Sequence, residues 1–252
     1  METMEPTMES TTDVPKIRTI RDFYAFEQHV RTCRSQRGLD MVPQWYEIPV
    51  FYFSNPNSVL GHGDLVVPPR GTLELDFELE IALMVGHEAI DLPADDSAMD
   101  CICAMTIYND WSARDLQRQE MAVGLGPAKG KDFANAFGPR WVPIASLMDR
   151  YDQGRFDLVM TAEINGKEVS RGNANSMYWT WPQILAHASR DTKLMPGDVI
   201  GSGTVGTGCI LELTPEKTGG WLQPGDRVSL FVERLGELQN SVGYPLPLPS
   251  RK

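Results

Sequence analysis

The residues best suited to chemistry in this sequence are four carboxylates at alternate positions of one short segment. Glu74, Asp76, Glu78 and Glu80 alternate with apolar residues over 73–85. Alternation is typical of a β-strand and places all four side chains on one face. Such a run fits a solvated sheet face. It also fits a site for a hard cation, since Glu78 and Glu80 would lie about 7 Å apart, a separation that one divalent ion can bridge with other oxygen ligands.

A second polar group follows the next apolar segment. Residues 102–108 predict a strand and 111–121 a helix, so Asp110 stands at their junction, where a helix N-cap is expected. Arg114 and Gln117 follow Asp110 at four and seven residues and would share a helix face with it. The pattern fits a capped surface helix with an ion pair. It fits equally a third carboxylate beside groups that bind an anionic or carbonyl-rich ligand.

Two further stretches carry residues that could take part in catalysis or binding. Apolar residues at three- and four-residue spacing predict a helix over 19–37, on which Asp22 and His29 would share one face. His29 has the ordinary pKa of a general base, although a lone histidine more often has a structural role. The glycine-rich segment 201–204, with Glu212 beyond it, would let backbone approach a ligand closely. It lacks the Gly-Lys-Ser/Thr of a phosphate-binding loop.

The elements that must position these residues are mostly short strands. We expect strands at 48–53, 73–85, 102–108, 199–200, 210–213 and 227–232, a hairpin at 158–169 with an Asn-Gly turn, and helices at 19–37, 111–121 and 175–189. Many short strands and few helices predict a β-rich α+β fold, and no strand–helix rhythm supports a doubly wound parallel sheet. We expect a flexible tail over 1–16, a single domain over 17–245 and a second tail over 246–252.

Composition excludes several classes of protein. The chain of 252 residues is 42% hydrophobic and 23% charged, which is typical of a globular protein and not of a disordered one. A net charge of -11 argues against generic binding to nucleic acid or to anionic membranes. No apolar run approaches the ~20 residues of a membrane span, and the polar N-terminus is unlike a secretory signal. The cysteines lack zinc or disulfide spacing, so we expect reduced thiols packed as small core residues in a cytoplasmic protein.

Several short motifs, taken in order, resemble one known family. They are Asp22-Phe23-Tyr24 with His29, Glu78-Leu79-Glu80, the run from Asn109-Asp110-Trp111 to Asp115, Gly130-Lys131, Tyr178-Trp179-Thr180, Pro196-Gly197-Asp198 and Ser202-Gly203-Thr204. Together they are similar to the catalytic domain of the fumarylacetoacetate hydrolase family over about 21–232. The resemblance implies a mixed β-roll or sandwich with a few flanking helices.

The resemblance also implies roles for individual residues. The positions that match the family's divalent-metal ligands, for Mg²⁺, Ca²⁺ or Mn²⁺, are Asp22, Glu78, Glu80 and Asp110. His29 matches the general base, Glu212 the carboxylate that orients it, and Lys131 a group that steadies developing negative charge. The matches to substrate contacts are Arg114, Gln117, Tyr52 and Thr204. Met121 stands where the family has a tyrosine that contacts the substrate. The resemblance therefore supports the type of reaction better than the identity of the substrate.

The activity implied is hydrolysis of a C–C bond in a 1,3-dicarbonyl acid resembling fumarylacetoacetate or an acylpyruvate. His29 and Glu212 would activate water, and the metal would stabilise the enolate. Decarboxylation or tautomerisation of oxaloacetate-like acids, and hydration or isomerisation of keto acids, use the same scaffold and remain open, as does a non-catalytic binding module. The expected partner is a small keto acid, and a homodimer is usual in the family.

Overall fold

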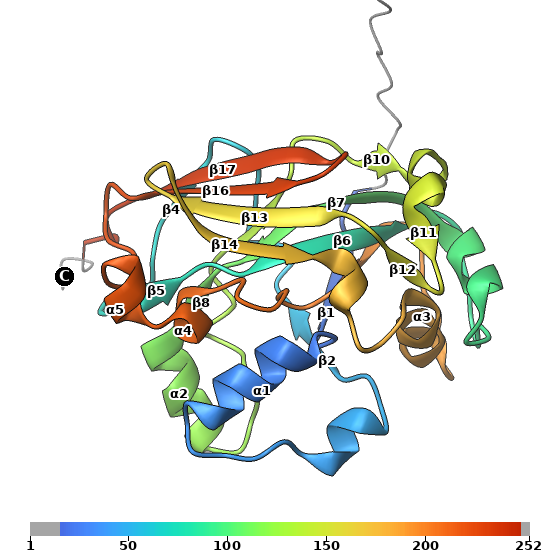
Figure 1. The fold of residues 1–252 in the computed structure, drawn as a ribbon, viewed down its shortest axis with the longest axis horizontal. Coiled ribbons are helices and arrows are strands. Elements are labelled where there is room, and N and C mark those ends of the chain that lie inside the picture. Colours follow the sequence, from blue (N-terminus) through green and yellow to red (C-terminus); the bar gives the residue numbers. More distant parts are fainter. Residues whose placement is uncertain (1–15, 248–252) are drawn as a thin grey trace, which may run out of the picture.

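A computed structural model describes residues 16–247 (Figure 1). The predicted tails lie outside the described residues, apart from Lys16 and residues 246–247. Within the described part, two curled sheets pack together, and the helices gather around their lower side and ends in the view of Figure 1. Mixed sheets with few helices confirm the predicted β-rich α+β fold.

The larger sheet is built from strands that are distant in the sequence. Its order is β2-β1-β15-β6-β7-β9-β3, with β10 beside β7. The bounds are β1 Thr19–Phe23, β2 Phe51–Ser54, β3 Val59–Leu60, β6 Leu79–Val85, β7 Ile102–Asp110, β9 Asn135–Phe137, β10 Val142–Pro143 and β15 Asp198–Gly201. Strand β1 runs parallel to β15, whereas β15, β6 and β7 are successively antiparallel. This order places β6 and β7 at the centre of the sheet.

The smaller sheet covers one face of the larger one. Its order is β14-β13-β16-β17-β4, and the bounds are β4 Leu65–Val66, β13 Val159–Ile164, β14 Lys167–Asn173, β16 Arg227–Val232 and β17 Gly236–Val242. The predicted hairpin turns at Asn165 and Gly166, both with positive φ. Two short ribbons complete the strands: β5 Leu75–Asp76 with β8 Ser112–Ala113, and β11 Tyr151–Asp152 with β12 Arg155–Phe156.

The helices are short. They are α1 Glu27–Ser35, α2 Arg114–Ala122, α3 Trp181–Ser189, α4 Ile210–Leu213 and α5 Pro215–Thr218, with 3-10 turns at Pro43–Tyr46, Asp96–Cys101, Ile144–Arg150 and Ala174–Ser176. Thr180 and Gln183 form a capping box that begins α3. Over residues 16–247, no helix is long and apolar enough to cross a bilayer.

Strand β6 has a packed core on both of its faces. Leu79, Ile81, Leu83 and Val85 belong to the main hydrophobic core, whereas Ala82 and Met84, on the other face, belong to a second, smaller one. Every residue of β6 is buried. A strand covered on both sides cannot present a solvated face, so a carboxylate on it needs a cation, a proton or a hydrogen-bond donor.

Several predicted elements differ from the structure. Residues 19–23 form β1 instead of the first turns of a helix, because they pair with β15 and β2. Residues 210–213 form the helical turn α4 instead of a strand, since Ile210 and Leu211 donate their backbone N–H groups to the Asp76 carboxylate. The predicted strand 73–85 is broken into β5 and β6 by residues 77–78.

Candidate metal centre and active site

The fold brings four carboxylates together in the interior. Asp22 comes from β1, Glu78 from the break before β6, Glu80 from β6 itself and Asp110 from the end of β7. All four are buried, and each offers an oxygen within 4.8 Å of the others. We call these four residues the acidic cluster. The solvated-face interpretation of the 73–85 segment is therefore wrong for Glu78 and Glu80.

Backbone forms one wall of the acidic cluster. The N–H of Gly203 donates to Glu80 Oε2 at 3.0 Å and to Asp22 Oδ1 at 3.3 Å. A Cβ added at Gly201 would lie 2.3 Å from Asp22 Oδ1. Gly203 has a φ of +78°, and a Cβ there would lie 2.4 Å from the carbonyl oxygen of Phe23. Glycine at both positions is what allows the backbone to approach the carboxylates this closely.

Two buried cations hold part of the acidic cluster. Lys131 Nζ lies 2.5 Å from Glu78 Oε2 and 2.5 Å from Asp110 Oδ2. Arg114 donates to Glu78 Oε1 at 2.7 Å and to Asp76 Oδ2 at 2.8 Å. Asp76 was not among the predicted site residues. It fixes the guanidinium, and it also accepts the two N–H groups that begin α4.

The remaining predicted ligand-contact residues touch the same network. The Tyr52 hydroxyl donates to Asp22 Oδ2 at 2.9 Å and also contacts Asp110 Oδ2. Thr204 Oγ1 donates to Glu80 Oε1 at 3.3 Å. Gln117 Oε1 accepts from Arg114 at 3.1 Å. Asp110 ends a strand and does not cap α2, whose N-cap is Ala113, so the predicted shared helix face exists only for the arginine and the glutamine.

The acidic cluster carries more negative charge than its neighbours neutralise. Burial raises the pKa of Glu80 well above its ordinary value, and the three other carboxylates add to the effect. Burial likewise raises the pKa of Asp110 to about 7, although Lys131 opposes it. For Glu78, burial is outweighed by Lys131 and Arg114, which hold the pKa well below its usual range.

One oxygen of the acidic cluster has a free lone pair. Asp110 Oδ1 is buried and accepts no hydrogen bond from the described residues. An orphaned carboxylate oxygen, surplus negative charge and an all-oxygen donor set are what a hard divalent cation requires. The residues present therefore fit such an ion.

A buried histidine and glutamate form the second part of the site. His29 Nδ1, on α1, lies 2.6 Å from Glu212 Oε1, on α4, and the backbone N–H of Thr207 donates to Glu212 Oε2 at 3.0 Å. Burial would lower the pKa of His29, but the Glu212 carboxylate raises it well above its ordinary value. The charge on His29 in turn helps to lower the pKa of Glu78. Contacts connect the pair to the acidic cluster, because Arg114 binds both Glu78 and Asp76, and Asp76 accepts the N–H groups that begin α4, which carries Glu212.

Different elements contribute Asp22 and His29 to the site. The sequence predicted that they share a helix face, whereas Asp22 lies on β1 and His29 on α1. The chain turns between them at residues 24–26, and the N–H of Ala25 bonds to the carbonyl of Ser202. The two side chains are thus positioned by the sheet and by a helix packed beneath it, not by one helix.

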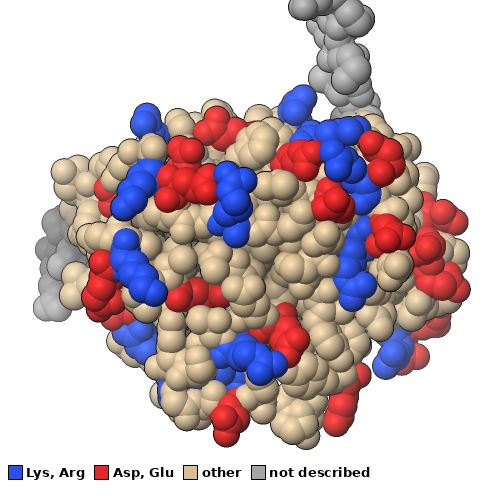
Figure 2. All heavy atoms as spheres, in the orientation of Figure 1, with Lys and Arg blue, Asp and Glu red and all other residues tan. Residues whose placement is uncertain are grey.

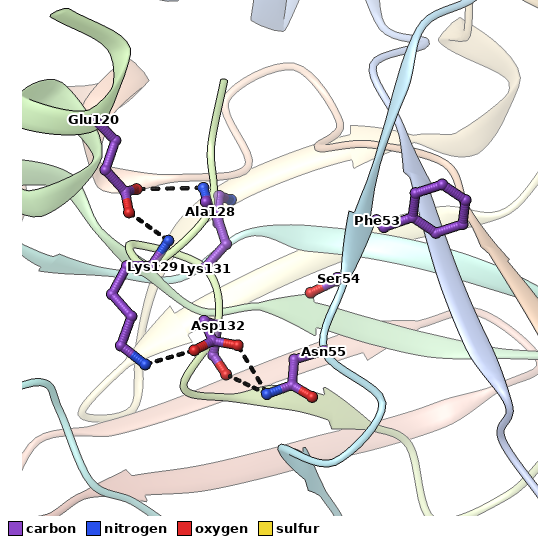
Figure 3. Close-up of a pocket in the computed structure, with 8 residues that line it drawn as sticks. All are labelled: Phe53, Ser54, Asn55, Glu120, Ala128, Lys129, Lys131 and Asp132. Carbon is purple, nitrogen blue, oxygen red and sulfur yellow. Dashed lines mark hydrogen bonds and ion pairs between the residues drawn. The ribbon is translucent and has the colours of Figure 1, made fainter. Parts of the chain in front are cut away.

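A cavity of about 520 Å³ opens beside Lys131 (Figure 3). It lies between β2 and the loop that follows α2. In Figure 3, Glu120 reaches from α2 to the backbone of Ala128 and Lys129, while Asp132 contacts Lys129 and Asn55. Lys131, which also contacts Glu78 and Asp110, is thus shared between the lining of this cavity and the acidic cluster. Positive and negative side chains are interspersed over the face of the molecule seen in Figure 2.

Comparison with known proteins places the chain among relatives of this architecture. Residues 18–243 match the family model described as "Fumarylacetoacetate (FAA) hydrolase C-terminal". The chain is 30% identical to a fumarylacetoacetase of Arabidopsis thaliana over 88% of its own length and 66% of that protein. It is 31% identical to the oxaloacetate tautomerase YisK of Bacillus subtilis over 78% of its length and 62% of that protein. The chain thus spans about two thirds of these curated relatives.

A solved structure shares the fold. It is a fumarylpyruvate hydrolase from Pseudomonas aeruginosa in complex with Mn²⁺ and pyruvate. The TM-score is 0.75 at 21% identity, and the match covers 94% of each chain. At this level of identity the likeness concerns the fold, including the mixed sheets that carry the acidic cluster.

Proposed function

The chain belongs to the fumarylacetoacetate hydrolase family, and on that premise we propose that it is a metal-dependent hydrolase that cleaves a C–C bond in a 1,3-dicarbonyl acid. The family scaffold serves hydrolysis and tautomerisation in the relatives named above. The observation that carries the choice of hydrolysis is the buried His29–Glu212 pair beside the acidic cluster. Hydrolysis needs an activated water, which such a pair can supply.

The proposed metal ligands are Asp22, Glu78, Glu80 and Asp110. Their support is the all-oxygen donor set, the surplus charge and the orphaned Asp110 oxygen. The hydrolase of the same fold was solved with Mn²⁺, and Mg²⁺ or Ca²⁺ suits the same ligands. A bound divalent ion would act as a Lewis acid toward the negative charge that develops on the substrate oxygens.

His29 is the proposed general base. Glu212 occupies Nδ1, which leaves Nε2 to take a proton from water. The resulting hydroxide oxygen forms a bond to one carbonyl carbon of the substrate. The C–C bond beside that carbon then breaks, its electron pair passing to the carbon between the two carbonyls. Protonation of this carbon from the His29 imidazolium completes the reaction and restores the base.

Three polar side chains are proposed to steady the substrate and its developing charge. Lys131 borders the cavity and carries a positive charge at the edge of the acidic cluster. Gln117 is half-buried and accepts a hydrogen bond from Arg114, and Arg114 itself holds Glu78 in place. Preorganised donors of this kind contribute about 3 kcal/mol each to transition-state stabilisation in water-excluded sites.

The closest competing reaction is tautomerisation or decarboxylation of an oxaloacetate-like acid. The 31% identical tautomerase favours it, and neither reaction requires an activated water. Isomerisation or hydration of a keto acid is a further alternative on the same scaffold. In tautomerisation or isomerisation His29 would move a proton of the substrate, whereas in hydration it would again take a proton from water.

A substrate panel tests the proposal. The Mg²⁺- or Mn²⁺-loaded protein is assayed with acylpyruvates, fumarylacetoacetate and oxaloacetate, and the products are separated by chromatography. We expect two fragments from a 1,3-dicarbonyl acid, one a carboxylic acid formed at the attacked carbonyl and the other a ketone or keto acid. Carbon dioxide release, or a change of ultraviolet absorbance without fragmentation, would instead assign decarboxylation or tautomerisation. A non-catalytic binding module would give no product with any of them.

We propose in addition a homodimer that acts in the cytoplasm on a small keto acid, without a nucleic-acid or membrane partner. The net charge of -11 supports the absence of an anionic partner. Light scattering after size-exclusion chromatography measures the mass directly. A mass near 28.1 kDa would identify a monomer and contradict the dimer.

A further inference from the structure

Two buried thiols flank the His29–Glu212 pair. Cys33 lies one turn after His29 on α1, and Cys209 precedes α4, which carries Glu212. The ligand atoms of His29, Cys33 and Cys209 all lie within 4.8 Å of one another, and the three residues are buried. None of the roles proposed above uses either thiol. We call these three residues and Glu212 the thiol cluster.

The spacing of the thiol cluster approaches that of a tetrahedral site. Cys33 Sγ lies 3.8 and 3.9 Å from the two ring nitrogens of His29. Cys209 Sγ lies 4.0 Å from His29 Nδ1 and 3.8 Å from Glu212 Oε1. Zinc bonds of about 2.3 Å to sulfur and about 2.0–2.2 Å to nitrogen or oxygen place neighbouring ligand atoms about 3.4–3.8 Å apart.

One edge of the thiol cluster is shorter than the others. His29 Nδ1 and Glu212 Oε1 are 2.6 Å apart because a hydrogen bond joins them. A cation that replaced the proton of this bond would need the two atoms to move apart by no more than about 1 Å. Arg114, which is paired with Asp76 and Glu78, also interacts electrostatically with both Cys33 and Cys209.

From this arrangement we propose a second metal site, formed by His29, Cys33, Cys209 and Glu212, that takes a thiophilic divalent cation such as Zn²⁺ or Cd²⁺. Nitrogen and sulfur donors select softer ions, whereas the all-oxygen acidic cluster selects hard ones. The chain therefore carries two neighbouring sites of opposite preference. A cation in the thiol cluster occupies the proposed base and its orienting carboxylate, and so it inhibits turnover. Only this inhibition rests on the proposed function; binding does not.

Cadmium gives a direct readout of the thiol cluster. The wild-type protein, saturated with Mg²⁺, is titrated with Cd²⁺ while the ultraviolet thiolate-to-metal charge-transfer band is followed. We expect a band that saturates at one equivalent. The variant Cys33→Ser/Cys209→Ser should lose the band and bind Cd²⁺ at least ~100-fold more weakly, since loss of an outer hydrogen-bond partner alone costs 10–100-fold. Circular dichroism checks its fold, and Cys33→Ala alone, which removes one ligand, should weaken binding in the same direction.

Cys101 and Cys103 supply the matched control. Cys101 ends the 3-10 turn Asp96–Cys101 and Cys103 lies on β7, so neither belongs to the thiol cluster, and the variant Cys101→Ser/Cys103→Ser should keep the full band. A band that survives in Cys33→Ser/Cys209→Ser, or one that is lost in the control variant, would overturn the site. Glu80→Gln, which alters only the acidic cluster, should also keep the band, because an all-oxygen site gives no thiolate charge transfer; its loss there would overturn the assignment of the band to a separate thiol cluster.

Inhibition is measured separately. Zn²⁺ is added to each Mg²⁺-loaded variant, and turnover is compared with the rate of the same variant without zinc. The wild type should be inhibited at one equivalent and recover with a chelator, whereas Cys33→Ser/Cys209→Ser should resist. A saturating cadmium band without zinc inhibition would uphold the metal site and contradict His29 as the base, so the two failures are distinguishable.

Discussion

Replacing Lys131 by Met should make the stability of this protein depend on divalent metal. The ammonium group is buried and lies 2.5 Å from both Glu78 and Asp110. Removing one partner of a buried ion pair costs about 3–5 kcal/mol, because the other charge is left without compensation. For a chain of this size, each 1 kcal/mol shifts the unfolding temperature by about 2–4 °C, so the metal-free variant should unfold about 6–20 °C below the wild type.

A divalent ion should reverse most of this loss. In the wild type the ammonium competes with a metal for the same two carboxylates. Lys131→Met should therefore bind Mg²⁺ more tightly than the wild type, and the gap in unfolding temperature should narrow when Mg²⁺ is saturating. Turnover should nevertheless fall by about 10²–10³-fold, as it does when one charge-stabilising donor is removed from a catalytic site.

Scanning calorimetry with and without Mg²⁺ measures both effects. Lys129→Met is the matched control, because this neighbouring lysine is exposed and pairs with Asp132 at the surface, where an ion pair contributes no more than about 1 kcal/mol. Equal unfolding temperatures for metal-free wild type and Lys131→Met would refute the argument from buried charge. So would a metal-free gap that Mg²⁺ leaves unchanged.

Three further variants test the assigned roles. His29→Gln should reduce turnover by about 10²–10⁴-fold, while calorimetric Mn²⁺ binding stays unchanged; a rate within tenfold of wild type would exclude His29 as the base. Glu80→Gln removes one charged oxygen from the acidic cluster and should lose bound metal, and an unaltered metal content by elemental analysis would remove Glu80 from the ligand set. In the wild type, kcat/KM should rise with pH through the pKa of His29, which Glu212 holds above 6.5, because the base must be neutral. In Glu212→Gln this rise should move to lower pH, since the carboxylate that raises the pKa of His29 is gone while burial, which lowers it, remains; a profile that stays in place would contradict the pairing.

The sequence located the acidic cluster better than it described its surroundings. Alternation over 73–85 identified a strand and its carboxylates, since a period of two is a local property. The same alternation is typical of a solvated face, and only the second sheet and the core behind β6 show that these carboxylates are buried. Asp76 belonged to the same pattern, but nothing local distinguished a carboxylate that fixes Arg114 from one that faces a metal.

Contacts between distant segments were beyond local patterns. His29 and Glu212 are 183 positions apart, and only the family resemblance connected them. Residues 19–23 look helical by their spacing but pair with strands at 51–54 and 198–201, so tertiary pairing overrides the local preference. The cysteines were interpreted as small core residues, and their approach to His29 depends on how α1 packs against α4.

The glycines beside the acidic cluster bear on how this protein tolerates mutation. Gly201 and Gly203 contribute no side chain, yet even a methyl group at either position would intrude on Asp22 or on the backbone of Phe23. A saturation mutagenesis experiment scored by activity would therefore be expected to find these two positions as intolerant as the carboxylates themselves. The space that these two glycines leave is therefore as much a part of the site as the carboxylates that face it.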